Sequence, residues 1–213
     1  MTASPLQQEL LMVAKRIGII GGSFDPIHIG HMIIAQDACE QFDLDRVLFI
    51  PARQAPLKAA DSCATPEQRL AMTQAATRED SRFEVSDIEF KLGAISYSVA
   101  TAEALKHERP SDALFWILGA DQLAQLHHWR DIGRLAELVS FIAFERPGST
   151  AGANNDLPPH TEILRAKARA IDISSSEIRR RLKTGLETKY FLPAPVFDYI
   201  KTRNLYRQRD NTE

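Results

Sequence analysis

The sequence predicts an α/β fold: a doubly wound, Rossmann-like parallel sheet flanked by helices, with a C-terminal helical segment. Short apolar runs alternate along the 213 residues with stretches of helical length, which is the order that parallel βαβ units require. Most of these runs are apolar without interruption, as expected of strands that are buried on both faces. Ligands of such sheets bind at the carboxyl ends of the strands.

The first predicted βαβ unit occupies the start of the ordered chain. Arg16–Ile20 is a compact apolar run that ends in glycines, so we expect a buried strand. The segment His31–Phe42 has helical length and spacing, and Arg46–Pro51 is a second strand that a proline stops. Residues 52–64 have the composition of a loop.

The next segment carries the clearest helix start in the chain. In Thr65–Thr77, the threonine is the N-cap, Pro66 takes the first helical position and Gln68 completes a capping box. We expect Arg82–Phe90 to be extended and Ser96–Glu108 to be helical.

The second half of the sheet follows the same alternation. Ala113–Gly119 and Val139–Arg146 are predicted strands, with a helix over Asp131–Leu138 between them. Residues 147–159 are rich in Gly, Pro and Asn, which indicates a loop. We expect the last strand at Ala168–Ile173.

The chain is predicted to end in two helices. A serine-capped helix covers 174–185 and closes at Gly185, and a terminal helix covers 194–204. We interpret 1–14 as an N-terminal extension, 15–207 as one domain and 208–213 as a tail.

Composition excludes several classes of protein. The formal net charge is −2, so no overall basic field favours nucleic acid. The longest apolar runs are too short to cross a bilayer, and the first residues lack the features of a signal peptide. We therefore expect a cytoplasmic protein without nucleic-acid or membrane partners, in which Cys39 and Cys63 are reduced thiols.

The stretch GIIGGSFDPIHIGH, at 18–31, predicts a phosphate site. Gly21 and Gly22 let the backbone approach a bulky anion, and a helix that starts near Gly30 offers N–H groups without intrahelical partners. His28 and His31 flank that start and can donate to phosphate.

Two other interpretations of this stretch stay open. The histidines could bind zinc, although only Asp25, His127 or His128 could complete such a site. Alternatively, a structural turn could contain them by chance. The stretch matches neither a Walker loop nor G-x-G-x-x-G.

A second anion site is predicted near the C-terminus. Residues 163–183 carry an excess of Arg and Lys, and SSSEIR places Ser175 and Ser176 at a helix start with Arg179 one turn later. We interpret Arg180 and Arg181 as a solvated face. Two phosphate sites in one domain suggest a substrate with several phosphates, or two phosphorylated substrates.

These motifs carry a resemblance to a known family. GGSFDPIHIGH resembles the first signature of the nucleotidyltransferase superfamily with an H-x-G-H element, and ISSSEIR resembles its second, I-S-S-T-x-I-R. Further segments resemble the bacterial nicotinate-nucleotide adenylyltransferases. These segments are SYS at 96–98, GAD at 119–121, Trp129, ERPG at 145–148 and YFLPAPVFDYI at 190–200. The resemblance extends from about Lys15 to Tyr206.

The resemblance implies a reaction of NAD biosynthesis. ATP and nicotinate mononucleotide would give nicotinate adenine dinucleotide and pyrophosphate, with Mg²⁺ held mainly through the ATP phosphates rather than by protein ligands. The nucleophile would be the 5′-phosphate of the mononucleotide, which is largely ionised at neutral pH because its second pKa is about 6. The enzyme would align and neutralise two anions without a covalent nucleophile.

The resemblance also implies roles for individual residues. The expected catalytic residues are His28, His31, Lys58 and Arg179. The expected ATP-binding residues are Gly22, Ser23, Phe24, His28, His31, Lys58, Gly119, Asp121, Ser175, Ser176 and Arg179. The expected pyridine-nucleotide residues are Gly22, Ser23, Ser98, Trp129 and Arg130.

One departure from the family and several alternatives remain. The family usually has P-P-H-K where this chain has APLK at 55–58, so Leu57 replaces a histidine while Lys58 is kept. A nicotinamide mononucleotide adenylyltransferase, a phosphopantetheine adenylyltransferase, a non-catalytic nucleotide-binding module and a zinc-bound regulatory protein are the alternatives. A homo-oligomer is left open.

Overall fold

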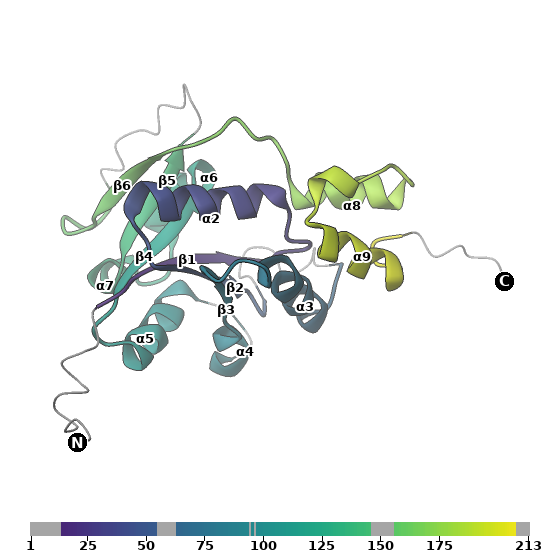
Figure 1. Cartoon of the computed structure of the whole chain (residues 1–213). Helices are drawn as coiled ribbons and strands as arrows, with labels where there is room; N and C mark the ends of the chain where they lie inside the picture. Colours follow the sequence, from purple (N-terminus) through teal and green to yellow (C-terminus); the bar gives the residue numbers. More distant parts are fainter. Residues whose placement is uncertain (1–13, 55–62, 94, 96, 146–155, 208–213) are drawn as a thin grey trace, which may run out of the picture.

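The structure is a computed structural model that describes residues 14–54, 63–93, 95, 97–145 and 156–207. Its sheet has six strands in the order β3-β2-β1-β4-β5-β6, and every pairing is parallel. Helices cover both faces, so the predicted doubly wound α/β fold is confirmed (Figure 1). The strands are β1 (Arg16–Gly22), β2 (Arg46–Pro51), β3 (Phe83–Val85), β4 (Ala113–Gly119), β5 (Ser140–Glu145) and β6 (Ile163–Lys167).

The helices of the described chain include the predicted ones, with small shifts of their ends. They are α2 (Ile29–Phe42), α3 (Pro66–Thr77), α4 (Ile88–Leu92), α5 (Ser98–Glu108), α6 (Ala120–Ala124), α7 (Ile132–Leu138), α8 (Ser175–Lys183) and α9 (Ala194–Thr202), with 3-10 turns η1 (Leu126–His128) and η2 (Lys189–Phe191). The capping box at the start of α3 forms as predicted, since Thr65 accepts from the Gln68 N–H and the Gln68 amide accepts from the Thr65 N–H. The short helix α6 and the turn η1 carry no clear signal in the sequence.

Alternation along the strands divides the core into two layers. Ile20 and Phe49 pack on one face of the sheet together with α2, α3, α8 and α9. Ile19 and Trp116 pack on the other face with α4, α5, α6 and α7. Each central strand is therefore buried on both sides, which explains why the sequence has unbroken apolar runs there.

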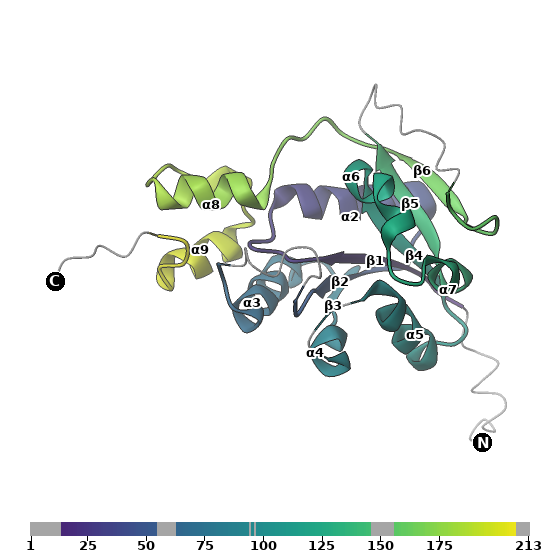
Figure 2. The same ribbon diagram turned by 180° about the vertical axis from the view of Figure 1, so that it is seen from behind.

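The topological switch lies between β1 and β4. The chain proceeds outward from β1 through β2 to β3, then returns to add β4, β5 and β6 on the other side of β1. Helices α8 and α9 stand beyond the carboxyl ends of the strands, at the yellow-green end of the molecule (Figures 1 and 2). This is the edge at which ligands of doubly wound sheets bind.

The predicted last strand at Ala168–Ile173 is wrong. The ladder between β5 and β6 runs from Ile163 to Lys167, where it ends opposite Glu145, so the following residues have no neighbouring strand in the described sheet. They form an extended connection to α8 instead. Arg169 fixes it to α2 through the carboxylate of Asp37, with nitrogen–oxygen distances of 2.9–3.1 Å.

The predicted extended segment Arg82–Phe90 is only half right. Phe83–Val85 pairs with β2, but the chain then turns into α4. The Ile88 N–H donates to the Ser86 hydroxyl at 3.3 Å, and the side chain of Ile88 is buried. The local serine bond competes with strand extension and starts the helix.

Among the described residues, no helix is long and apolar enough to cross a membrane.

Candidate active site

A cavity of about 560 Å³ lies at the carboxyl ends of β1 and β4. One wall is the loop after β1 together with the start of α2, and the opposite wall is the connection 168–174 with the start of α8. Gly119 and Asp121 close the floor where β4 meets α6. The cavity therefore joins the two signature segments that lie about 150 residues apart in the sequence.

The glycine loop after β1 turns sharply at Phe24. This residue adopts φ 47°, a left-handed conformation that is costly for an aromatic residue. Its ring is buried, packs on Phe49 and meets the His31 ring edge-on at 5.1 Å between centroids. A Cβ on Gly22 would lie 3.2 Å from the Phe24 ring, so the glycine makes this turn possible.

His28 caps the start of α2 and is 6% exposed. Burial lowers the pKa of His28 to about 4, so the imidazole is neutral at pH 7. Its Nδ1 is buried without a hydrogen-bond partner in the described structure. A Cβ on Gly30 would lie 3.0 Å from this Nδ1, which explains the glycine between the two histidines.

His31 is oriented by the backbone of His28. The His28 N–H donates to Nδ1 of His31 at 3.2 Å. Because Nδ1 is an acceptor, the neutral ring carries its proton on Nε2, which is then a donor. The two rings lie 3.8 Å apart at an angle of 31°, so the first turn of α2 presents a pair of imidazoles next to its N–H groups.

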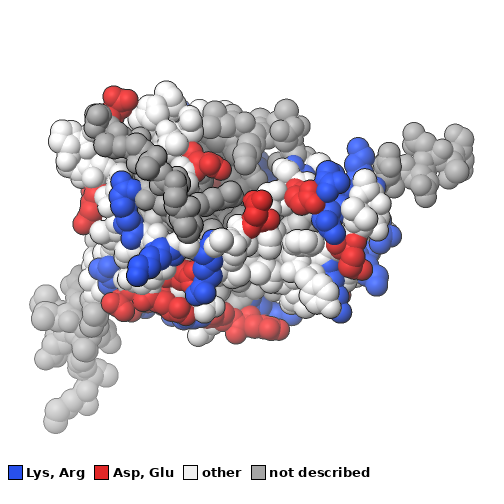
Figure 3. All heavy atoms as spheres, turned by 90° about the horizontal axis from the view of Figure 1, so that it is seen from above, with Lys and Arg blue, Asp and Glu red and all other residues white. Residues whose placement is uncertain are grey.

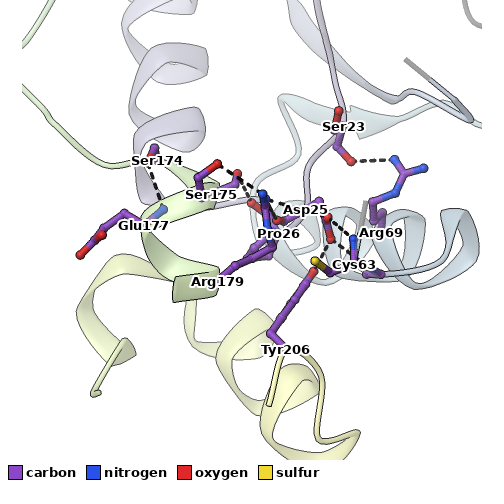
Figure 4. Close-up of polar contacts among 12 residues, drawn as sticks. Ser23, Asp25, Pro26, Cys63, Arg69, Ser174, Ser175, Glu177, Arg179 and Tyr206 are labelled. Carbon is purple, nitrogen blue, oxygen red and sulfur yellow. Dashed lines mark hydrogen bonds and ion pairs between the residues drawn. The ribbon is translucent and has the colours of Figure 1, made fainter. Parts of the chain in front are cut away.

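The start of α8 is bonded directly to the loop after β1. Ser174 caps the helix by accepting from the Glu177 N–H at 3.2 Å. The Ser175 hydroxyl donates to the Pro26 carbonyl at 2.9 Å, and Nη1 of Arg179 donates to the Asp25 carbonyl at 2.8 Å (Figure 4). The predicted second anion site therefore stands beside the first, although the Ser175 hydroxyl proton is used within the protein.

Asp25 and Arg69 are buried charges; the sequence indicated Asp25 only as a possible zinc ligand and did not single out Arg69. The Asp25 carboxylate accepts from the N–H groups of Cys63 and Ala64 at 2.8 and 3.1 Å, and from the Tyr206 hydroxyl at 2.7 Å. The Arg69 guanidinium, 2% exposed, donates to the carbonyls of Ser23, Ala52 and Arg53 at 2.6–2.9 Å. Both fix the loop after β1.

The floor of the cavity leaves room for a ligand. A Cβ added to Gly119 would meet no protein atom within 4 Å, and the Asp121 side chain is exposed in the first turn of α6. Ile33 and Ile34 of α2 face the cavity from one side and Ile171 and Ile173 from the other. Sequence reasoning missed this apolar end, because the segment 168–173 was assigned to the sheet.

Of the expected pyridine-nucleotide residues, Gly22 and Ser23 line this cavity, whereas Ser98, Trp129 and Arg130 lie outside its lining. The Arg130 guanidinium lies 4.4 Å from the centre of the Tyr97 ring, directly before Ser98 and α5. Trp129 is half-buried and meets Trp116 edge-on at 6.1 Å. Arg130 thus stands beside the start of α5, and Trp129 precedes it directly in the chain.

The remaining expectations have different outcomes. Lys58 and Leu57 lie outside the described residues. The zinc interpretation gains no support, because no three His, Cys, Asp or Glu side chains gather at one point in the described parts of the chain. Of the two cysteines, Cys39 is buried and Cys63 is exposed, and both are free thiols.

Arg180 is exposed as predicted, whereas Arg181 is half-buried, lies over the Phe191 ring and donates to the Glu187 carbonyl at 3.2 Å. Arg180 donates twice to Glu177 at 2.8 Å, and Arg181 lies 3.5 Å from the same carboxylate. At the α8 end of the face drawn in Figure 3, basic and acidic side chains accordingly stand side by side.

This fold and this cavity define a nucleotidyltransferase. The family model described as Cytidylyltransferase-like matches residues 19–181, and the chain belongs to that family. A solved structure titled Plasmodium falciparum nicotinic acid mononucleotide adenylyltransferase complexed with NaAD is similar in fold, with a TM-score of 0.73 and 21% identity over 90% of this chain and 97% of that one.

Within that family, the chain belongs with the nicotinate-nucleotide adenylyltransferases. A protein of Opitutus terrae named "Probable nicotinate-nucleotide adenylyltransferase" is 48% identical over 192 residues, which are 90% of this chain and 98% of the relative. A protein of the same name from Methylacidiphilum infernorum is 41% identical, over 90% of this chain and 92% of the relative.

Proposed function

We propose that this chain transfers AMP from ATP to nicotinate mononucleotide, giving nicotinate adenine dinucleotide and pyrophosphate. One observation carries the proposal: the loop after β1 and the start of α8 meet around a single cavity, joined by the bond from Arg179 to the Asp25 carbonyl at 2.8 Å. The N-termini of α2 and α8, two histidines and an arginine there suit a polyphosphate. The relatives named above support the same reaction.

The chemistry of such a site is positioning and charge stabilisation. His28, neutral because burial lowers its pKa to about 4, and His31 donate to the ATP phosphates from the first turn of α2. Arg179, Lys58 and Ser176 hold the outer phosphates. The 5′-phosphate of the mononucleotide attacks the α-phosphorus, and the bond to the pyrophosphate oxygen breaks.

Mg²⁺ enters this proposal with ATP. The imidazoles, backbone N–H groups and guanidinium of the cavity fit phosphate oxygens, and in the described parts of the chain no three His, Cys, Asp or Glu side chains gather to hold a metal ion. We therefore assign Mg²⁺ to the phosphates, where it would neutralise charge on the leaving pyrophosphate. Gly119 and Asp121 contact the adenosine part.

The pyridine ring packs against Trp129 in this proposal. The backbone near Ser98 and Arg130 receives the carboxylate of the pyridine, and the positive charge of Arg130 favours nicotinate over nicotinamide. A cytoplasmic location and a homo-oligomer stay predictions from the sequence.

Pyrophosphate release measures the proposed reaction directly. With MgATP, we expect release on addition of nicotinate mononucleotide, and a lower kcat/KM with nicotinamide mononucleotide. His31→Ala, checked for folding by circular dichroism, is the control and should lose about two to three orders of magnitude in kcat. A higher kcat/KM with nicotinamide mononucleotide would favour a nicotinamide mononucleotide adenylyltransferase. If neither mononucleotide led to release of pyrophosphate, the proposal would be contradicted.

A further inference from the structure

The carboxylate of Asp25 accepts hydrogen bonds from two distant parts of the chain, at 63–64 and at Tyr206. It is 2% exposed. Oδ2 accepts from the Cys63 N–H at 2.8 Å, and Oδ1 accepts from the Ala64 N–H at 3.1 Å and from the Tyr206 hydroxyl at 2.7 Å. Tyr206 reaches it from the end of the described chain, beyond α9 (Figure 4).

Arg179 stands next to this carboxylate but is bonded elsewhere. Its Nη1 donates to the backbone carbonyl of Asp25 at 2.8 Å and lies 3.9 Å from Oδ2. Its Nη2 donates to the Ser176 hydroxyl at 3.3 Å. A buried carboxylate attracts a guanidinium more strongly than a carbonyl does, so something must keep the two charges from forming a close bidentate pair.

We infer that Tyr206 is a positioning residue for ATP, because its hydroxyl occupies Asp25 and so keeps Arg179 directed at the cavity. This inference rests on the proposed function and on the phosphate role of Arg179 within it. The two hydrogen bonds on Oδ1 and the one on Oδ2 fix the orientation of the Asp25 carboxylate, so that Oδ2 stays 3.9 Å from Nη1 of Arg179 and the guanidinium is held through the Asp25 carbonyl.

The surroundings of Tyr206 support a dedicated contact. The residue adopts φ 66°, a left-handed conformation that is unfavourable for a tyrosine and that persists only where other contacts enforce it. Its hydroxyl lies between Asp25 and the sulfur of Met72, which is 4.0 Å away. Burial, together with the charge of Asp25, raises the pKa of this hydroxyl above its usual range, so it stays a donor.

Removal of the hydroxyl should redirect Arg179. In Tyr206→Phe, Asp25 loses one of its donors and its charge is compensated less. The guanidinium then moves from the carbonyl towards the carboxylate, and ATP must compete with Asp25 for it. ATP binding weakens, whereas the pyridine subsite around Trp129 is not involved.

The test compares Tyr206→Phe with Tyr199→Phe, a control on α9 whose ring packs under the Arg203 guanidinium. We expect Tyr206→Phe to raise the KM for ATP about three- to tenfold without changing the KM for nicotinate mononucleotide. The Kd of MgATP, measured by calorimetry without the mononucleotide, should rise by the same factor. The control should change neither constant.

A double-mutant cycle distinguishes a contact through Arg179 from a general structural role. In an Arg179→Ala background, Tyr206→Phe should leave the Kd of MgATP unchanged. An equal loss in both backgrounds, or a lower Tm with unaltered ATP binding, would overturn the inference. Turnover by the wild-type protein in the same assays reports separately on the proposed function.

Discussion

His28 shows how a single environment sets the chemistry of this site. Burial lowers its pKa to about 4, against 6.5 for an exposed histidine, so it is a neutral donor throughout the physiological range. In the proposed reaction, anionic phosphates are bound without a fixed positive charge at this position. Arg179, on the other wall, and Lys58 supply the positive charge in that proposal.

The pKa of His28 predicts a pH dependence of stability. Between pH 6.5 and 4 the unfolded chain binds a proton that the folded protein does not, so the free energy of unfolding falls as the pH falls. The loss reaches about 3 kcal/mol near pH 4. Urea denaturation across this range should therefore give a steeper decline for wild type than for His28→Asn, and parallel curves would contradict the assignment.

Gly30 is predicted to be a functional glycine and not a helix defect. In Gly30→Ala, the new Cβ lies 3.0 Å from Nδ1 of His28 and pushes the ring by a few tenths of an ångström. We expect kcat to fall about tenfold, since small displacements in a site are costly, with little change in Tm. Gly133→Ala is the control, because a Cβ there meets nothing within 4 Å; equal activity of the two variants would refute the prediction.

Contacts between residues that are close in the sequence were predictable, and contacts between distant residues were not. The glycines and histidines of 18–31 predict a phosphate site from the sequence alone, because the loop and the helix start that form it are neighbours in the chain. For Asp25, the sequence suggested only a possible zinc ligand, and the structure shows a buried carboxylate that accepts hydrogen bonds instead. Its partners Cys63 and Tyr206 lie 38 and 181 residues away, and nothing in one sequence links them.

At the scale of elements, the connection 168–174 determines where α8 stands. Gln41 of α2 forms two hydrogen bonds with the backbone of Lys167, at 2.8 and 3.1 Å, and Asp37 holds Arg169 one turn earlier on the same helix. These bonds attach the segment that leads into α8, and so into the second signature, to α2, the helix that begins within the first signature. The alternation of apolar residues at Ile171 and Ile173 is typical of a strand, but in the structure these side chains line the cavity.

The tie between Asp37 and Arg169 should contribute measurably to stability. Asp37 is 4% exposed and accepts three hydrogen bonds from the exposed guanidinium of Arg169, so Arg169→Ala leaves a buried carboxylate without its partner. We expect the free energy of unfolding by urea to fall in Arg169→Ala, because the buried carboxylate loses its partner. Arg180→Ala breaks a pair in which both side chains are exposed and should cost less, and equal losses would argue against the tie.

Elements were predictable where their cause is local. Unbroken apolar runs gave β1, β2, β4 and β5, and the capping box gave α3. The end of β6 is set by the end of its neighbour β5 at Glu145, and this depends on tertiary structure that the local sequence does not encode. The turn into α4 at Ser86 was missed because the extended pattern and the serine cap compete over a few residues.

At the scale of the whole molecule, the sheet brings the two helix starts that are predicted to bind anions to one edge, where direct hydrogen bonds join them. The direct bonds from α8 to the loop after β1, through Ser175 and Arg179, make one site from the two signatures. We expect this site to work by holding two phosphorylated substrates in line. Such a mechanism requires a single displacement at the α-phosphorus, with no adenylylated enzyme.

The stereochemical course at that phosphorus tests this claim most directly. The reaction is run with ATP that carries a chiral phosphorothioate at the α-position, and the configuration of the dinucleotide product is determined. One in-line displacement by the mononucleotide phosphate predicts inversion. Retention would mean two successive displacements through a covalent enzyme intermediate, and it would contradict the account.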